Sequence, residues 1–312
     1  MKKLSLLLLL VALVSCGPSA LAANTWVDQV GNWSEPNKWS GDGIPNGSAE
    51  VLIRSAASQC TLDSNAGDWT TAQRLRVYVD ANLIIADGGQ LLGVSWMRAG
   101  TSEGPGEVIQ TGGLVKLKSG ADSSKLIVGY ENGSQGSRYT ISGGTITFLD
   151  GNAYLIIGYR GGEGTLTVVG TGPKIEMRKL YVGGDLGDKG ATGNLQFKIA
   201  ADGVSSLKLS DNVYIDRQSD VATANLIVNA IAEPPKAAIV LVEDTGSGGI
   251  EGKFDTITDA KGSKPAEEGA AVVLTFGDKE YHYKLTYTYD ASNDGSTNDV
   301  ALVYEPEPAE AP

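Results

Sequence analysis

The residue types that perform acid–base or nucleophilic chemistry are sparse in this sequence. His282 is its single histidine, and a lone histidine does not assemble a zinc site without cysteines or further histidines. Nothing near His282 in sequence supplies a nucleophile on a recognisable turn. The alternating residues around it favour a polar side chain on a strand face. The sequence therefore predicts no catalytic residue.

The segment DASNDG, residues 290–295, has the opening of a calcium-binding loop, with Asp290 and Asp294 as candidate ligands. A complete loop needs a bidentate glutamate at position 12, which is Ala301 here. A hairpin turn built on Asn-Asp-Gly explains the same residues. Calcium stays a candidate cofactor with that turn as the alternative, and no other cofactor is predicted.

A third group of side chains suits ligand binding rather than catalysis. These residues stand between the apolar pairs of short predicted strands, or in the turn that follows, and so should point outward. Stacked at the spacing of about 4.8 Å between strands of a sheet, they would form a continuous apolar and aromatic stripe. Aromatic faces stack on sugar rings while tyrosine hydroxyls form hydrogen bonds. The candidate ligand-binding residues are Ile127, Ile156, Tyr130, Tyr159, Tyr181 and Tyr214.

Such a stripe rarely stays bare on an exported protein. One alternative is that the C-terminal part covers it, through the alternating face that runs from Tyr281 to Tyr289. The other is a docking face for an extracellular polysaccharide or a surface protein.

Glycine-rich repeats of three short strands must position these residues. LIVGYENGSQGSRYTISGGTITF from Leu126 and LIIGYRGGEGTLTVVGTGPKIEM from Leu155 begin 29 residues apart. Each contains apolar i, i+2 pairs, which place side chains on one face of a strand. Gly129, Gly158 and Gly183 recur at intervals of 29 and 25 residues, within the period range of solenoids. The pattern predicts an all-β, right-handed parallel β-helix, with an antiparallel sandwich as the alternative.

The two ends of the chain differ from the repeats, as the caps of a solenoid do. Trp26, Trp33 and Trp39 stand among turn residues near the beginning, and the last residues are too polar and Pro-rich to fold. The expected segments are a signal peptide (1–22), an N-terminal capping region (23–74), β-helix repeats (75–235), a C-terminal β region (236–304) and a disordered tail (305–312).

The first 22 residues are typical of a bacterial export signal: two lysines, a leucine-rich run, Pro18 and a small-residue cleavage site ending at Ala22. The run Leu13-Val14-Ser15-Cys16 also fits a lipoprotein signal, in which Cys16 would be acylated. Export leading to secretion, or to a lipid anchor through Cys16, are therefore both expected. No other apolar stretch approaches the roughly 20 residues that a transmembrane helix needs.

Charge and cysteine content narrow the class of partner. Removal of the leader changes the net charge from −12 to −14, with 23 basic residues against 37 acidic ones. That balance argues against nucleic acid and anionic membranes, because both attract clustered cations. Only Cys60 would remain after ordinary cleavage, so no intramolecular disulfide is possible.

The repeat motifs carry a family resemblance. The copies VGY…G…ISGG and IGY…GEGTLTVVG resemble the autotransporter- and PEP-CTERM-associated β-strand repeats of secreted bacterial proteins. GNWSEPNKWSGDGIPNGSAEVLI is similar to their N-terminal caps, and FDTIT…YKLTYTYDASNDGSTNDVALV is similar to the segment that closes them. The resemblance implies a secreted or surface β-helix and no single activity. The outer-membrane barrel of an autotransporter and the apolar helix of a PEP-CTERM anchor are missing, which favours release or lipid anchoring.

These observations favour a structural or adhesive β-helix at, or released from, a bacterial envelope. The alternative is a β-helix that binds or degrades extracellular polysaccharide. Degradation needs paired carboxylates, or calcium beside a basic residue, on one outer face. The outward residues of the second and third strands form no such set: Thr140, Thr167, Gln196, Thr147, Glu176 and Lys208.

Overall fold

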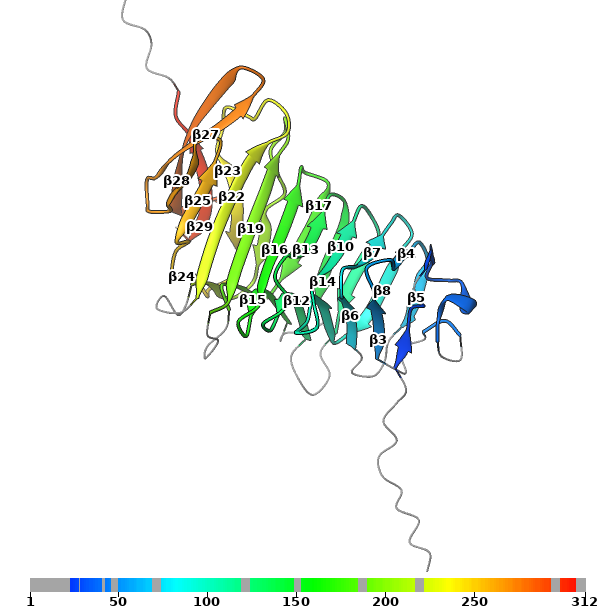
Figure 1. The fold of residues 1–312 in the computed structure, drawn as a ribbon. Helices are drawn as coiled ribbons and strands as arrows, with labels where there is room; N and C mark the ends of the chain where they lie inside the picture. The colour runs from blue at the N-terminus through cyan, green and yellow to red at the C-terminus, as the bar shows by residue number, and fades with distance from the viewer. Residues whose placement is uncertain are drawn as a thin grey trace, which may run out of the picture.

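The computed structural model describes residues 23–306 except residues 28, 41–42, 46–49, 69–73, 119–123, 149–152, 185–189, 217–221 and 293–297. The described chain winds into a parallel β-helix of about seven turns. Three β-sheets run along its length, and each turn contributes one strand to each sheet (Figure 1). The only helical element among the described residues is the 3-10 turn η1 (Pro36–Lys38).

We number the sheets in the order in which a coil visits them. Sheet 1 contains β1 (Asn24–Thr25), β3 (Val51–Arg54), β6 (Arg74–Tyr78), β9 (Trp96–Ala99), β12 (Ser124–Tyr130), β15 (Ala153–Tyr159), β18 (Lys179–Val182), β21 (Val213–Ile215) and β24 (Ile250–Glu251). Sheet 2 contains β2 (Val30–Asn32), β4 (Gln59–Leu62), β7 (Ala81–Ile85), β10 (Gly106–Gln110), β13 (Ser137–Ile141), β16 (Glu163–Val169), β19 (Thr192–Ile199), β22 (Thr223–Ala230), β25 (Thr256–Asp259) and β26 (Gly262–Pro265). Sheet 3 contains β5 (Asn65–Asp68), β8 (Gln90–Val94), β11 (Leu114–Leu117), β14 (Gly144–Phe148), β17 (Pro173–Met177), β20 (Leu207–Leu209), β23 (Ile239–Asp244), β29 (Asp299–Tyr304), β28 (Lys279–Tyr289) and β27 (Ala271–Phe276).

Strand pairing between coils is parallel and keeps the repeats in register. Leu126 lies opposite Leu155, and Val128 lies opposite Ile157. These inward side chains are fully buried in one continuous core. A shift of one residue would turn every inward side chain outward, so burial fixes this register. The parallel β-helix is therefore confirmed over the antiparallel sandwich.

The recurring glycines form the corner at which each coil leaves sheet 1. Gly129 and Gly158 have φ angles of +79° and +73°, a backbone conformation that favours glycine. A Cβ atom on Gly129 would lie 2.2 Å from the carbonyl oxygen of Glu163, and one on Gly158 would lie 2.4 Å from that of Thr192. Both oxygens belong to the start of sheet 2 in the next coil. Glycine is thus required for the conformation and for the close approach of adjacent coils.

The N-terminal end of the core is closed by aromatic packing. Trp26, Trp33 and Trp39 are buried, and Trp39 packs edge-on against the other two with ring centroids 4.9 and 4.8 Å away. The Nε1–H of Trp39 donates to the carbonyl oxygen of Trp33 at 2.9 Å. This cluster shields the first coil from solvent.

The C-terminal end is closed by antiparallel strands. β28 pairs antiparallel with β27 on one side and β29 on the other, and β29 joins sheet 3 by antiparallel pairing with β23. Tyr281, Tyr283, Leu285 and Tyr287 of β28 face inward and join the main core. The alternation predicted for this strand is therefore confirmed (Figure 1).

Coils extend beyond the expected range of 75–235 on both sides. β3 to β5 already supply one strand to each of the three sheets. β24 and β25 continue sheets 1 and 2 past residue 235. These outer coils lack the glycine-flanked apolar motif of the central ones, which explains why the pattern points to a shorter helix.

Candidate functional site on the outer face of sheet 1

The structure brings the predicted stripe together on the outside of sheet 1. Ile127 pairs with Ile156, Ile156 with Tyr181, and Tyr181 with Tyr214, each on the neighbouring strand. Tyr130 lies beside Tyr159 at the corner. These six residues form a second apolar cluster, separate from the main core, with Trp96 and Tyr154 packed against it.

The aromatic rings of this cluster contact one another from coil to coil. Tyr181 stacks on Tyr214 with ring centroids 4.7 Å apart, and Tyr154 meets Tyr181 edge-on at 5.7 Å. Tyr130 and Tyr159 are 5.6 Å apart. Aromatic pairs in this range contribute about 0.5–1.5 kcal/mol beyond the area they bury. The contacts therefore help to hold adjacent coils together.

A second column on the same face alternates cations with aromatic rings. Successive pairs in register run from Arg74 through Trp96, Lys125 and Tyr154 to Lys179. The strand spacing of about 4.8 Å puts like residues of this column about 10 Å apart. The alternation extends over five consecutive coils, from β6 to β18, so it covers the central part of this face.

Cationic groups lie over the rings. The guanidinium of Arg98 is 3.7 Å from the ring centroid of Tyr130 and 4.7 Å from that of Trp96. The ammonium of Lys125 lies 5.0 Å from the Trp96 ring. Arg160 lies 5.2 Å from the ring of Tyr159, and its Nη1 donates to the hydroxyl of Tyr130 at 3.1 Å. Cation–π pairs occur about once per 70–80 residues in proteins, so their concentration on one face is unusual.

This arrangement corrects the expectation that the C-terminal region covers the stripe. The Tyr281–Tyr287 face of β28 is buried in the main core and does not contact the stripe. Arginine and lysine side chains of sheet 1 and its corner lie over the stripe instead, because their aliphatic stems pack on rings while the charged ends reach water. Four of the predicted binding residues, Tyr130, Tyr159, Tyr181 and Tyr214, are only 6–8% exposed. The side chains presented to a ligand are therefore mainly cations, together with the half-buried Trp96 and Tyr154.

Carboxylates neutralise part of this face. Glu50 pairs with Arg76 at 2.7 Å, and Asp211 pairs with Arg178 at 2.9 Å and with Lys179 at 3.6 Å. Burial acts to raise the pKa of Asp211, but the N–H of Asn212 and the two cations outweigh it and lower that pKa. Asp211 is therefore a carboxylate at neutral pH.

Arg98 stands in a different environment. It is 6% exposed, and its Nε has no hydrogen-bond partner. Burial lowers the pKa of Arg98 to about 10; the ring hydroxyl of Tyr130 and Glu131 oppose this, while Arg76 and Arg74 add to it. The side chain still carries its charge at neutral pH. Among the described residues, no carboxylate lies within ion-pair distance of Arg74 or Arg98.

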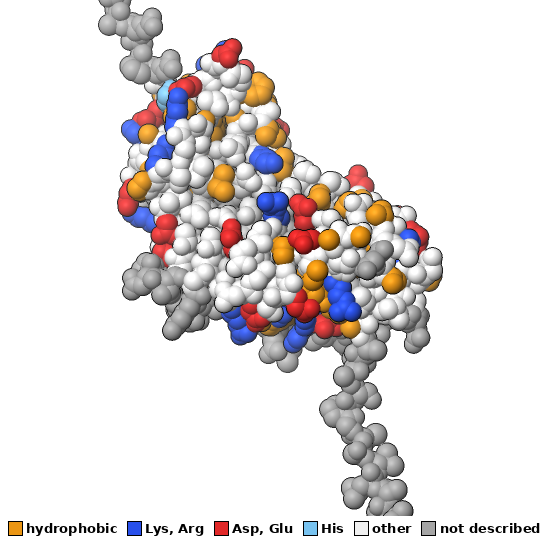
Figure 2. Space-filling model, in the orientation of Figure 1, with side chains coloured by type: hydrophobic (Ala, Val, Ile, Leu, Met, Phe, Trp, Pro, Cys, Tyr) orange, Lys and Arg blue, Asp and Glu red, His pale blue; other side chains and the backbone are white. Residues whose placement is uncertain are grey.

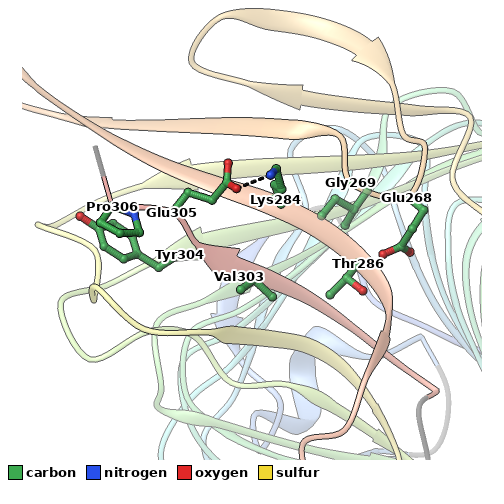
Figure 3. A pocket seen from close by; sticks show the side chains of 9 residues that line it. Glu268, Gly269, Lys284, Thr286, Val303, Tyr304, Glu305 and Pro306 are labelled. Carbon is green, nitrogen blue, oxygen red and sulfur yellow. Dashed lines mark ion pairs between the residues drawn. The ribbon is translucent and has the colours of Figure 1, made fainter. Parts of the chain in front are cut away.

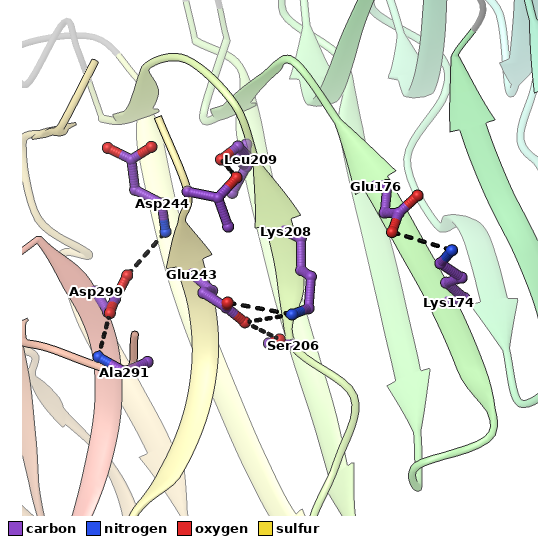
Figure 4. A network of polar contacts seen from close by, with 10 residues as sticks. Lys174, Glu176, Ser206, Lys208, Leu209, Glu243, Asp244, Ala291 and Asp299 are labelled. Carbon is purple, nitrogen blue, oxygen red and sulfur yellow. Dashed lines mark hydrogen bonds and ion pairs between the residues drawn. The ribbon is translucent and has the colours of Figure 1, made fainter. Parts of the chain in front are cut away.

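The acidic residues on sheet 3 are held by neighbouring groups. Glu176 lies 3.1 Å from Lys174, and Glu243 lies 3.1 Å from Lys208 (Figure 4). Asp299 accepts hydrogen bonds from the backbone N–H groups of Asp244 and Ala291, each at 2.8 Å (Figure 4). Burial is the main cause that raises the pKa of Asp299, and these two hydrogen bonds oppose it. These carboxylates fix strands and turns, and they do not face one another across an open cleft.

An open groove of about 600 Å³ lies against the C-terminal strands β28 and β29 (Figure 3). Its cation, Lys284, forms an ion pair with Glu305 across the groove. Val303 contributes an apolar wall, and Gly269 lies at the far end. The charged side chains that line the groove are already engaged, Lys284 with Glu305 and Glu268 with the backbone N–H of Tyr287, so sheet 1 is the stronger candidate site.

The remaining candidate residues from the sequence are dispersed. His282 lies on the polar face of β28, as predicted. Asp290 follows β28, whereas Asp294 lies outside the described residues, so the calcium prediction stays untested. No group of three or more His, Cys, Asp or Glu side chains suited to a metal occurs within the described ranges. Cys16 and the leader lie outside the described residues, and Cys60 is buried as a free thiol.

The outer side of sheet 2 contrasts with sheet 1. Figure 2 shows mainly uncharged side chains and backbone over the strands of sheet 2, with charged side chains gathered along the lower edge, where Figure 1 places strands of sheet 1. Thr140, Thr167 and Gln196 lie in register there, and Thr167 donates to Gln196 at 2.9 Å. The middle of this face is thus a row of neutral hydrogen-bonding groups, and charged residues such as Arg138 and Lys198 lie on the same outward side.

Sequence reasoning missed the cations of sheet 1. The apolar positions of the first strand predict the stripe, whereas the cations beside them carry no apolar signal. The signal was present as i, i+2 pairs on the outward side of each first strand. These pairs are Arg74/Arg76, Trp96/Arg98, Lys125/Ile127, Tyr154/Ile156 and Lys179/Tyr181.

Comparisons with protein families, curated proteins and solved structures found no match for this chain. None of the described helices is long and apolar enough to span a bilayer.

Proposed function

We propose that this chain is an exported, non-catalytic β-helix that adheres to extracellular polysaccharide through the outer face of sheet 1. The observation that carries the proposal is the alternation of cations and aromatic rings across five coils. A linear polymer repeats its chemical groups along one direction, and a solenoid repeats its side chains in the same way. A flat, repetitive face suits such a partner better than it suits a small molecule, which needs a concave pocket.

Two features of the sequence support an extracellular setting. The leader at residues 1–22 has the composition of an export signal, and the repeats resemble those of secreted bacterial β-helices. Cleavage after Ala22 would release the protein, whereas acylation of Cys16 would tether it to the envelope. Either route places the sheet-1 face outside the cytoplasm.

Adhesion is favoured over polysaccharide degradation by the state of the outward carboxylates. Glu176 and Glu243 each have a lysine within 3.1 Å. Glycoside hydrolysis uses two carboxyl groups on either side of the scissile bond, about 5–10 Å apart and open to substrate. The carboxylates around sheet 1 are likewise tied to Arg76, Arg160 and Arg178. These contacts leave them suited to positioning cations.

The test is a binding assay on a panel of soluble and insoluble polysaccharides, combined with assays for new reducing ends and unsaturated products. We expect retention of the protein on at least one polysaccharide without product formation. Lys125→Glu with Lys179→Glu should weaken retention at least tenfold. Lys198→Glu, a partly exposed position on the outward side of β19 in sheet 2, is the control for charge. Equal retention of all variants, or release of products, would contradict the proposal.

A further inference from the structure

We infer that Arg74, Arg76, Arg98 and Trp96 form an anion subsite that receives a carboxylate group of an acidic polysaccharide. This inference rests on the proposed function and specifies the chemical class of the polysaccharide. The subsite lies at the N-terminal end of the sheet-1 face, on β6 and β9.

The first observation is the environment of Arg98. Its side chain is 94% removed from solvent by burial, yet the described residues provide no carboxylate within ion-pair distance and no acceptor for its Nε. Burying a charge without such a partner is costly. The rings of Tyr130 and Trp96 hold the guanidinium plane in place without satisfying its N–H groups. The Nε–H is itself closed off from solvent, so a ligand would meet this oriented cation through its Nη groups.

The second observation is the placement of like charges. Arg76 lies directly opposite Arg98 on the neighbouring strand, and like charges in opposite positions destabilise a sheet. Arg74, on the same strand as Arg76, lies over the Trp96 ring at 5.3 Å and adds a third positive charge. Glu50 offsets one of the three, at 2.7 Å from Arg76. The cluster therefore keeps an excess of positive charge on a chain whose net charge is −12.

These features fit a carboxylated sugar chain. A guanidinium matches a carboxylate with two parallel N–H···O bonds, so the exposed Arg74 can bind a carboxylate beside the Trp96 ring, where Arg98 adds a second positive charge. The half-buried Trp96 lies between the two arginines and offers a ring edge to the apolar side of a sugar. Lys125 and Lys179 continue the column at intervals of about 10 Å, a length comparable to the disaccharide repeat of an extended polysaccharide. A uronic-acid polymer, which carries one carboxylate on each sugar, can thus follow the column with every second carboxylate.

The experiment uses the full mature protein with polygalacturonate, alginate, dextran sulfate and a neutral xylan as probes. We expect polygalacturonate or alginate to bind at least tenfold more tightly than xylan, with an affinity that decreases as salt increases. Arg98→Gln should weaken this binding at least tenfold, and Arg98→Lys should recover only part of it, because the fork is lost. Arg74→Gln, at an exposed position that does not threaten folding, should weaken it severalfold.

Arg138→Gln is the matched control, since it removes the same charge from an exposed outward position on sheet 2. Binding of uronic-acid polymers that is insensitive to Arg98→Gln and Arg74→Gln, but is lost in the Lys125 and Lys179 variants, would overturn the subsite and leave the proposed function standing. Preferential binding of xylan or dextran sulfate would overturn the carboxylate assignment. A wild-type protein that binds none of the four probes, and no member of the wider panel, would refute the proposed function itself.

Discussion

Removing the hydroxyl group of Tyr139 should destabilise the core through the hydrogen bond that it leaves unmade. Tyr139 is fully buried inside β13, and its hydroxyl donates to Oε1 of Gln110 at 2.7 Å. Gln110 is also fully buried, and its Nε2 donates to the carbonyl oxygens of Gly112 at 3.1 Å and Thr145 at 3.2 Å. Two polar side chains within the core therefore satisfy each other and the backbone of the coil.

The magnitude follows from the group that is left unsatisfied. Tyr139→Phe keeps the ring and its packing, but it deprives Oε1 of Gln110 of the tyrosine donor. A buried acceptor without a partner costs about 1–3 kcal/mol. Gln110 cannot turn toward water, because its amide nitrogen is tied to two carbonyl oxygens. We expect a loss of about 2 kcal/mol in the free energy of unfolding.

Urea unfolding followed by far-UV circular dichroism measures this loss, with an unchanged m-value as the sign that the native state is otherwise intact. Tyr289→Phe is the matched control, because Tyr289 is only partly buried at the end of β28. A Tyr139→Phe protein that is as stable as this control would show that Gln110 finds another donor. The hydrogen bond would then not organise the core as described.

Three further predictions concern the core and its titrating groups. Val128→Asp should abolish soluble expression, because an unpaired charge in the core costs several kcal/mol against a total stability of about 5–15 kcal/mol, whereas the outward Thr140→Asp should express normally. Burial raises the pKa of Tyr139 above its usual range and raises that of Tyr283 to about 12. Since the unfolded tyrosines lose their protons near pH 10 and the folded ones do not, the free energy of unfolding should fall as pH rises above about 10. The lowered pKa of Arg98 has the opposite effect on the free energy of unfolding. A free energy of unfolding that rises above pH 10 in urea titrations would contradict the burial of the tyrosines. Burial is also the main cause that raises the pKa of Cys60, so a thiol reagent at pH 8 should react with it only after denaturation; rapid reaction of the native protein would contradict its placement.

The sequence predicts the central coils well because their signals are local. Gly129 and Gly158 mark the corner, and apolar pairs such as Leu155/Ile157 mark the inward face, so each strand can be placed from its own residues. The parallel arrangement then follows from repetition, since a single coil cannot bury its apolar pairs alone. The structure places these residues in register, with the pairs inside.

The membership of the outer coils and the environment of Arg98 depend on contacts that no local pattern specifies. β3 to β5 lack the glycine corner of the central repeats, and they belong to the helix because they pair with β6 to β8. Arg98 looks like an ordinary surface residue in the sequence. Only the stacking of coils brings it over the ring of Tyr130, which follows in the next coil.

The packing partner of β28 is a second feature that the sequence does not specify. Its alternation is evident in the sequence, and the inward side of the strand is correctly predicted. The sequence does not predict which surface this strand covers, because both the end of the main core and the stripe on sheet 1 are apolar regions that it could cover. In the structure, the inward side of β28 packs against the end of the main core. Long cationic side chains cover the stripe on sheet 1 instead.

The in-register pairing of coils has a consequence for how such a protein changes in evolution. One coil supplies both a layer of core and one row of the sheet-1 face. Each internal coil contacts only the coils next to it, so the structures that close the two ends contact only the terminal coils. Duplication of a segment such as residues 126–154 would lengthen the molecule by one strand spacing, about 4.8 Å, and leave both ends unchanged. Under the proposed function, it would also add one more point of attachment to the polysaccharide, and linked weak contacts raise the overall affinity by orders of magnitude. The number of coils would thus determine the affinity for the polysaccharide. An unequal crossover can change that number without substituting any residue.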